Sequence, residues 1–372
     1  MTKLNNKPFC YAPWTNIQYS GVYEGGGASP CCEWHGKRFT GKVKDYLDSE
    51  YLTQVKKHML DHNMEELQTS CDACIHIESK GLKSQRNFIE KKTKQYNQYD
   101  AVWRIDYRPD NLCNFKCRMC SPYSSNLIEE EYIKIGKLDD YIEKRPTDDV
   151  IDFDFSNLKE FAILGGEPTF NKKLYKILDY LIDNKYNENI MISYTTNCSS
   201  VPEEWTYRIK QFRDLHINIS LDAIGNTLEY VRTNANWKII EKNLWKTIDL
   251  TDSYSLRPVL TAYSFMNVEE WVEYFFQFPE HTLDISPVYG QIPLKISAIP
   301  DHIREEKIEY LNSLNHPFAT QISNIASTYT YSKEYFEKFK RKTELDDKIR
   351  KTSVFDLNKG FYRVWNYATR IQ

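Results

Sequence analysis

Three cysteines lie within eight residues, at Cys113, Cys117 and Cys120, with the spacing C-x3-C-x2-C. Thiolates this close together suit an iron-sulfur cluster or a thiophilic ion such as zinc. A structural zinc site has four protein ligands, whereas a cluster held by three cysteines leaves one iron open to a small molecule. The absent fourth ligand therefore favours a cluster with an open iron, and a zinc site completed by a distant Cys or His is the alternative.

The stretch Leu112–Cys120 resembles the cluster loop of the radical S-adenosylmethionine (SAM) superfamily. The resemblance implies that the three cysteines hold a 4Fe-4S cluster whose open iron binds SAM. Reductive cleavage of SAM then yields a 5'-deoxyadenosyl radical, which takes a hydrogen atom from the substrate. Met119 occupies the position at which the backbone of this family meets the adenine of SAM. A flavodoxin- or ferredoxin-type electron donor is implied as well.

Five further cysteines precede this loop, and four of them form a second candidate metal site. Cys71 and Cys74 make a C-x2-C step, which presents two sulfurs to one metal, and Cys10 together with Cys31 or Cys32 completes four ligands. Four ligands close the coordination shell, so we expect a structural or electron-transferring site with no place for SAM. Zinc is the alternative here too, because a four-cysteine site accepts either metal.

The N-terminal cysteine segment resembles a twitch module, the auxiliary-cluster segment of certain radical SAM proteins. In that module a glycine precedes the ligand with four residues between them. The spacing from Gly26 to Cys31 fits this pattern and favours Cys31 as the ligand, although Gly27 and Cys32 are spaced in the same way. The resemblance therefore implies a second iron-sulfur cluster, of the 4Fe-4S type.

Strand-like and helix-like segments alternate through the middle of the chain, which predicts an α/β fold with a parallel sheet. The radical SAM resemblance narrows this to a six-stranded partial (β/α) barrel. The expected strands are 101–107, 160–164, 189–197, 215–222, 255–265 and 282–289, and the clearest helices are 123–134, 172–184, 203–212, 237–249 and 268–278.

Two of these strands alternate polar and apolar residues. Arg104, Asp106 and Arg108 alternate with apolar residues in the first strand, and 215–222 shows the same pattern. In a parallel barrel one face of each strand packs under the helices, so the polar residues are expected to point into the lumen and to receive a polar substrate. Alternatively, they pair with one another.

The second expected strand is followed by Gly165, Gly166, Glu167 and Pro168, which match the GGEP motif of the superfamily. Glycines allow a backbone to approach a ligand closely, and a carboxylate accepts hydrogen bonds from an ammonium group. The resemblance implies that this motif binds the methionyl amine of SAM. Its place at the carboxyl end of a barrel strand, where barrel sites lie, supports that role.

The next two strands end in polar residues at positions where the family binds the ribose and carboxylate of SAM. These residues are Thr195 and Asn197 after the third strand, and Ser220 and Asp222 after the fourth. Arg232 resembles the arginine that holds the carboxylate of SAM, since a guanidinium makes paired charge-assisted bonds to such a group.

We therefore predict three modules: a twitch-like module with a linker over residues 1–100, a barrel over 101–300 and a C-terminal helical cap over 301–372. A hairpin is expected within residues 14–32 and a helix over 43–63, while 84–100 is expected to be a helix or linker. In the cap, 303–312 and 333–350 are expected to be helices that pack on the barrel or contact the substrate.

The charge and composition of the chain limit its partners. The net charge of −3 gives no general attraction to nucleic acid or anionic membranes, and the absence of both a signal-like N-terminus and a run of eighteen apolar residues predicts a cytoplasmic protein. The leading hypothesis is a radical SAM enzyme acting on a peptide or protein side chain. A small molecule or nucleotide is the alternative substrate, and a zinc-stabilised binding protein without catalysis is the alternative function.

Overall fold

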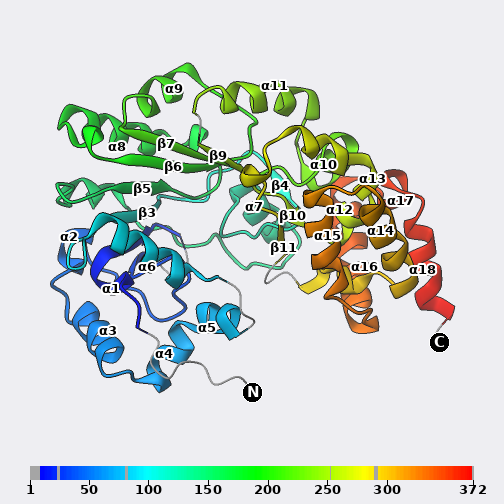
Figure 1. Cartoon of the computed structure of the whole chain (residues 1–372), viewed down its shortest axis with the longest axis horizontal. Coiled ribbons are helices and arrows are strands. Elements are labelled where there is room, and N and C mark those ends of the chain that lie inside the picture. Colours follow the sequence, from blue (N-terminus) through cyan, green and yellow to red (C-terminus); the bar gives the residue numbers. More distant parts are fainter. Residues whose placement is uncertain (1–8, 23–25, 80–82, 252, 289–291, 371–372) are drawn as a thin grey trace. The chain divides into compact units, whose positions relative to one another are not determined.

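The computed structural model divides the chain into two compact units (Figure 1). The first unit comprises residues 1–113, 122–194 and 202–215, and the second comprises 114–121, 195–201 and 216–372. The structure describes residues 9–22, 26–79, 83–251, 253–288 and 292–370. Each unit is considered by itself.

The first unit is built on a mostly parallel sheet. Its strand order is β2-β1-β3-β5-β6, in which only β2 runs antiparallel to its neighbour. Residues Asn16, Arg104, Glu160 and Met191 lie side by side along one row of this sheet. The strands are β1 (Asn16–Ser20), β2 (Gly27–Ser29), β3 (Arg104–Arg108), β5 (Glu160–Ile163) and β6 (Met191–Thr196).

The alternation of β3 sorts its residues onto two faces, as the sequence predicts. Ile105 and Tyr107 are fully buried beside Phe161 of β5. On the other face the Arg104 guanidinium donates to Asp106 at 2.9 Å and to Glu160 at 2.6 Å. Arg104, Asp106 and Glu160 therefore pair with one another. This pairing is the alternative that the sequence left open beside a polar lumen that receives the substrate.

Helices flank this sheet, and their starts follow local capping rules. The Asn171 side chain accepts from the Lys173 N–H and begins α8, whose buried residues include Leu174, Leu178 and Leu181. The helices are α1 (Ala12–Thr15), α2 (Val43–Tyr46), α3 (Glu50–Leu60), α4 (Met64–Ser70), α5 (Asp72–Ser79), α6 (Gln85–Tyr96), α7 (Asn126–Lys134), α8 (Lys172–Asp183) and α9 (Glu203–Ile209).

The second unit contains shorter strands and a larger group of helices. Its core gathers buried residues such as Tyr263, Leu294, Phe339 and Phe361. The strand β7 (Asp214–Ile219), which begins in the first unit, pairs in parallel with β9 (Tyr254–Leu256). Likewise, β10 (Val259–Leu260) pairs in parallel with β11 (Ser286–Pro287). The third pair, β4 (Lys116–Cys117) and β8 (Arg232–Thr233), is antiparallel. The helices are α10 (Gly225–Val231), α11 (Trp237–Ile248), α12 (Ala262–Met266), α13 (Val268–Trp271), α14 (Asp301–Ser313), α15 (Pro317–Ser327), α16 (Lys333–Arg350), α17 (Val354–Leu357) and α18 (Phe361–Arg370).

Several elements differ from the sequence predictions. The strand expected over 255–265 is wrong beyond Leu260, because Thr261 and Ser264 form a reciprocal cap that begins α12. The helix expected over 43–63 is two helices, since α2 ends at Tyr46 and Ser49 caps the start of α3. The strand expected over 282–289 is reduced to β11, and Tyr289 lies outside the described residues.

The N-terminal hairpin is confirmed, because β1 and β2 pair antiparallel, although Gly25 of its turn lies outside the described residues. The sequence did not indicate that β1 also pairs in parallel with β3. The α/β class is confirmed, whereas the number of barrel strands and the three-module division stay predictions. No helix in the described ranges is long and apolar enough to cross a membrane.

Candidate functional site

Hydrogen bonds to neighbouring segments fix the chain that leads into Cys113, in the first unit. The Cys113 N–H donates to Asn126 Oδ1 at 2.8 Å. Two residues earlier, the fully buried Asn111 donates from its amide to Pro122 O and to Glu129 Oε2, at 2.7 and 2.8 Å. These bonds tie the entry of the cysteine loop to the start of α7.

The Gly165–Pro168 motif is packed against this same segment. The Glu167 N–H donates to Leu112 O at 2.8 Å, and a Cβ placed on Gly166 would lie 2.0 Å from that oxygen. Gly165 has φ +124°, a conformation that favours glycine. Both glycines are therefore required for the motif to lie beside the residue that precedes Cys113.

Glu167 is buried, with 1% of its surface exposed. Its carboxylate accepts from Thr169 Oγ1 at 3.0 Å and caps the turn that begins at Pro168. The carboxylate is thus held in place by the chain. Its predicted contact with the SAM amine stays a prediction.

In the second unit, Cys117 lies beside a buried ion pair. Arg232 Nε donates to Asp222 Oδ2 at 2.7 Å, and its Nη1 lies 3.8 Å from Cys117 Sγ. Burial alone would lower the pKa of Arg232, but the Asp222 carboxylate and the Cys117 sulfur raise it above its usual range. The structure thus pairs Asp222 and Arg232, both of which the resemblance assigns to SAM binding.

The other residues predicted to bind SAM in this unit lie on segments that are joined by hydrogen bonds to their neighbours. Asn197 donates from its amide to Asn114 Oδ1 at 3.0 Å, next to the cysteine loop. The Ser220 N–H donates to Thr196 O at 2.9 Å, so the segments that carry Thr195 and Ser220 are adjacent. Their contacts with SAM stay predictions.

Arg118 is a residue near the cysteines whose importance sequence reasoning missed. Its side chain is fully buried, stacks 3.7 Å from the centre of the Tyr230 ring, and donates to Asp347 Oδ1 and Thr352 Oγ1, both at 2.7 Å. Arg350 reaches the same loop, donating to Lys116 O at 3.0 Å. The end of α16 thus anchors the cysteine loop. The sequence signal for this anchoring is an arginine inside the cysteine motif.

Comparison with known families identifies the central part of the chain. The family model described as the radical SAM superfamily matches residues 107–274, which include all three clustered cysteines and the Gly165–Pro168 motif. The chain carries a radical SAM domain. The radical SAM assignment made from the cysteine spacing is therefore confirmed, and the superfamily is one of enzymes that use SAM and a 4Fe-4S cluster.

Two curated relatives share part of this chain. An uncharacterized protein of Methanocaldococcus jannaschii is 27% identical over 184 residues, which is 48% of this chain and 60% of that protein. The GTP 3',8-cyclase of Campylobacter lari is 28% identical over 144 residues, 37% of each chain. The chain therefore spans less than two thirds of the length of either relative.

The solved structures to which the chain is similar include native anSMEcpe with bound AdoMet and Cp18Cys peptide. It is 17% identical, with a TM-score of 0.39, over 57% of this chain and 61% of that one. Streptococcus suis SuiB bound to the precursor peptide SuiA is 15% identical, with a TM-score of 0.39, over 72% of this chain and 60% of that one.

The donors of the radical SAM domain fit its cofactors. Cys113, Cys117 and Cys120 are thiols, the ligands that iron-sulfur clusters take, and Cys113 belongs to the first unit while the other two belong to the second. Met119 packs partly buried against the core of the second unit. Within the described residues, no three His, Cys, Asp or Glu side chains are arranged as a ready metal site.

The N-terminal thiols gather in the first unit. Cys10 and Cys31 both pack against the buried residues Ala12, Ile89 and Trp103. Burial raises the pKa of Cys10 to about 12, and the charges of Cys71 and Cys74 add to that rise. Cys10 thus has Cys71 and Cys74 as electrostatic neighbours, and the assignment of these thiols to one metal site stays a prediction.

Cys31 and Cys32 have different neighbours. Burial raises the pKa of Cys31 well above its usual range, and besides Cys32 the charges that contribute are those of Cys10 and Cys71. Burial also raises the pKa of Cys32, but the charges that act on it are those of Asp106, Glu33 and Arg104. The two adjacent thiols therefore face different surroundings, which spacing alone could not reveal.

Arg86 supplies positive charge beside the N-terminal thiols. Its Nη1 donates to Phe9 O at 3.2 Å and its Nε to Glu78 at 2.9 Å. Burial raises the pKa of Cys74, while hydrogen bonds from the Arg86 N–H and the Ser84 hydroxyl lower it in part. Such donors stabilise thiolates, and the binding of a metal by these cysteines stays a prediction.

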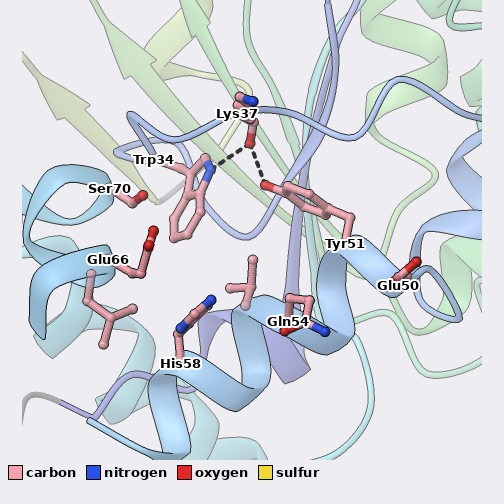
Figure 2. Close-up of a pocket in the computed structure, with 10 residues that line it drawn as sticks. Trp34, Lys37, Glu50, Tyr51, Gln54, His58, Glu66 and Ser70 are labelled. Atoms are coloured by element: carbon pink, nitrogen blue, oxygen red, sulfur yellow. Dashed lines mark hydrogen bonds between the residues drawn. The ribbon is translucent and has the colours of Figure 1, made fainter. Parts of the chain in front are cut away.

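The loop after Cys32 borders a cavity of about 560 Å³ (Figure 2). Trp34 Nε1 and Tyr51 Oη both donate to Lys37 O, at 3.0 and 2.6 Å, and so tie the loop to α3. In Figure 2 the Trp34 ring points between α3 and α4, toward Glu66 and His58. These bonds join residues 34–37, which follow Cys32, to α3.

Proposed function

We propose that this chain is a radical SAM enzyme with two iron-sulfur clusters, one bound by Cys113, Cys117 and Cys120 and a twitch-type auxiliary cluster bound by Cys10, Cys31, Cys71 and Cys74. The substrate is a peptide or protein side chain, and electrons come from a flavodoxin- or ferredoxin-type donor. When bound, the open cluster supplies the electron that cleaves SAM.

One observation carries this proposal. The Gly165–Pro168 motif is hydrogen-bonded through Glu167 to Leu112, the residue before the first cluster cysteine. About fifty residues of sequence separate the two motifs, and their contact brings a glycine without room for a Cβ and a buried carboxylate beside the cysteine loop, as a shared ligand site would require. A non-catalytic zinc protein does not explain this pairing.

The protein residues have distinct roles in this proposal. Glu167 accepts hydrogen bonds from the SAM amine, and Arg232, held by Asp222, presents a guanidinium to the SAM carboxylate. Thr195, Asn197 and Ser220 bind the ribose and the remaining polar groups.

The auxiliary site has a preferred set of ligands. Cys31 packs with Cys10 on one apolar cluster and has Cys71 as an electrostatic neighbour, whereas Cys32 does not. We therefore assign Cys31 and leave Cys32 outside the ligand set. No open iron remains, so this cluster transfers electrons or stabilises the fold.

The test is a triple Ala variant of Cys113, Cys117 and Cys120, reconstituted anaerobically. It should contain about four irons fewer than the wild type and form no 5'-deoxyadenosine from SAM. Cys198→Ala is the matched control, because that thiol is also buried, with 1% exposed, and lies outside both sets. A triple variant that still forms 5'-deoxyadenosine, or a colourless wild type that contains zinc only, would overturn the proposal.

A further inference from the structure

The helix α11 carries a row of lysines on its exposed side. Lys238, Lys242 and Lys246 follow one another at intervals of four residues, so they lie along one face, and all three side chains are exposed. Among the residues that the structure describes, no ion pair involves any of the three. The acidic residues of this segment are Glu241, which is half-buried, and Asp249, which is the C-cap. The row therefore presents positive charge to the solvent.

Two large apolar side chains flank this row. Ile239 and Trp245 lie three residues before and three residues after Lys242, and 53% and 41% of their surfaces are exposed. The Trp245 ring stacks on Phe278 with 5.4 Å between the ring centres, which holds it in place. A tryptophan that is held in this way and still exposed is a common anchor in protein–protein interfaces. The three lysines, Ile239 and Trp245 together are called the lysine face.

The opposite side of α11 is already buried. Its buried residues are Ile240, Leu244 and Thr247. A helix that lies in a membrane surface needs a wide apolar face that is exposed, whereas the exposed apolar residues of α11 are Ile239 and Trp245, one on each flank of the lysines. A protein partner with an acidic face therefore fits this helix better than an anionic lipid surface.

Hydrogen bonds connect α11 to the loop of the cluster cysteines. The Asn234 amide, just before α11, donates at 3.3 Å to the carbonyl oxygen of Asn114, which lies inside the cysteine motif. The Asn243 amide, within α11, donates to Cys198 O at 3.1 Å, and the neighbouring Asn197 donates to Asn114 Oδ1. All of these residues belong to the second unit. A partner docked on α11 is therefore linked to the cysteine loop within one unit.

We infer that the lysine face docks an electron-transfer protein whose own docking face is acidic, of the flavodoxin or ferredoxin type. Opposite charges steer such a partner to the helix, and Trp245 supplies an apolar contact for it. The reduced partner gives one electron to the cluster site and leaves oxidised by one electron. This inference rests on the proposed function, because it names the surface that receives the electron donor of that enzyme.

The experiment measures the binding of an oxidised flavodoxin, and separately of an oxidised ferredoxin, to the full reconstituted chain by anaerobic calorimetry. The wild type should bind one of them at low ionic strength and lose affinity as salt is added, because salt screens exposed charges. A variant with Lys238→Glu, Lys242→Glu and Lys246→Glu should bind that protein about tenfold more weakly.

A variant with Lys57→Glu, Lys91→Glu and Lys176→Glu is the matched control. These lysines are exposed on the helices α3, α6 and α8, and the control variant has the same net charge as the α11 variant. It should keep most of the affinity for the donor protein. Circular dichroism shows whether both variants are folded.

SAM cleavage gives a second readout. With the reduced donor protein, the α11 variant should form much less 5'-deoxyadenosine than the wild type. With dithionite, a small reductant that needs no docking surface, the two should form it equally.

The inference would be overturned if the wild type bound neither donor, or if the α11 variant and the control bound the donor equally. A loss of dithionite-driven SAM cleavage in the folded α11 variant, or tighter binding of the wild type to phosphatidylserine vesicles than to either donor, would overturn it as well. A wild type that cleaves no SAM even with dithionite would contradict the proposed function instead, and the binding measurement would still decide the role of α11.

Discussion

The two cysteine sets of this chain differ in their surroundings. In the first unit, Cys10 and Cys31 pack against the apolar residues Ala12, Ile89 and Trp103. In the second unit, Cys117 lies 3.8 Å from Arg232, which is paired with Asp222. Apolar residues pack against Cys10 and Cys31, with Arg86 supplying positive charge to that set, whereas a buried pair of opposite charges adjoins Cys117.

This difference agrees with the number of sulfurs in each set. Four thiols complete a coordination shell, so their surroundings need only exclude water and hold the ligands in place. Three thiols leave a position for a charged ligand, and charged partners must then be available nearby. The contrast supports a closed auxiliary cluster and an open SAM-binding cluster, and the following variants test it.

The largest effect is expected at the N-terminal set. Cys31→Ala should remove one cluster of about four irons while SAM cleavage by the other cluster continues, because the SAM-binding cysteines are unchanged. Cys32→Ala is the matched control and should keep the full iron content, since Cys32 faces Asp106 and Arg104 instead of Cys10. Iron analysis and Mössbauer spectroscopy of both variants provide the measurement.

The opposite result is equally informative. Loss of iron in Cys32→Ala together with retention in Cys31→Ala would make Cys32 the ligand in place of Cys31. It would also show that packing against the apolar residues does not identify the ligand. Zinc at this site with iron only at the other would remove the auxiliary cluster from the proposed function.

A smaller effect is expected where α16 supports the central cysteine loop. Asp347 accepts from Arg118, Tyr230 and Thr352 at 2.7 to 2.9 Å, and its loss would leave Asp346, at 3.8 Å, as the carboxylate beside the fully buried Arg118 guanidinium. Asp347→Ala should therefore lower the free energy of unfolding by about 3 to 5 kcal/mol.

Urea unfolding followed by circular dichroism measures this change, and Glu344→Ala, an exposed position on the same helix, is the control. If Asp347→Ala is no less stable than the control, the charges near the central motif do not hold the loop. The contrast between the two cysteine sets would then rest on Arg232 and Asp222 alone.

Much of the fold follows from local patterns in the sequence. The helix α16 has the bounds predicted for it, and β5 and α8 agree within one residue, because a regular pattern runs through each of them and a capping residue begins both helices. The pairing of β1 with β3 was missed, since alternation along a strand does not reveal which strand lies beside it. The helix α15 was missed too, in a stretch read only as part of the cap.

The candidate site divides in the same way. The spacing of the cysteines and the Gly165–Pro168 motif were sufficient to identify the radical SAM domain. Spacing could not separate Cys31 from Cys32, which fit the same glycine pattern, because the difference lies in which way each side chain points. Likewise, the sequence did not show that Asp347 holds Arg118, a contact that joins residues 229 positions apart.

The smallest effect is expected at Glu167, which tests whether the open set has the charged partner it requires. Its carboxylate is buried and accepts from Thr169 Oγ1 at 3.0 Å, a bond that the carbonyl oxygen of a glutamine can also accept. Glu167→Gln should therefore keep the fold and the iron content but lose the charge that attracts the SAM amine. SAM affinity should fall by roughly ten- to a hundredfold, the value of a charge-assisted hydrogen bond of about 1.5 to 3 kcal/mol. Anaerobic calorimetry on reconstituted protein measures this, and Thr169→Val, which removes the bond that orients Glu167 but keeps its charge, should weaken SAM less. Unchanged affinity in Glu167→Gln would mean that the buried carboxylate serves only to cap the turn at Pro168.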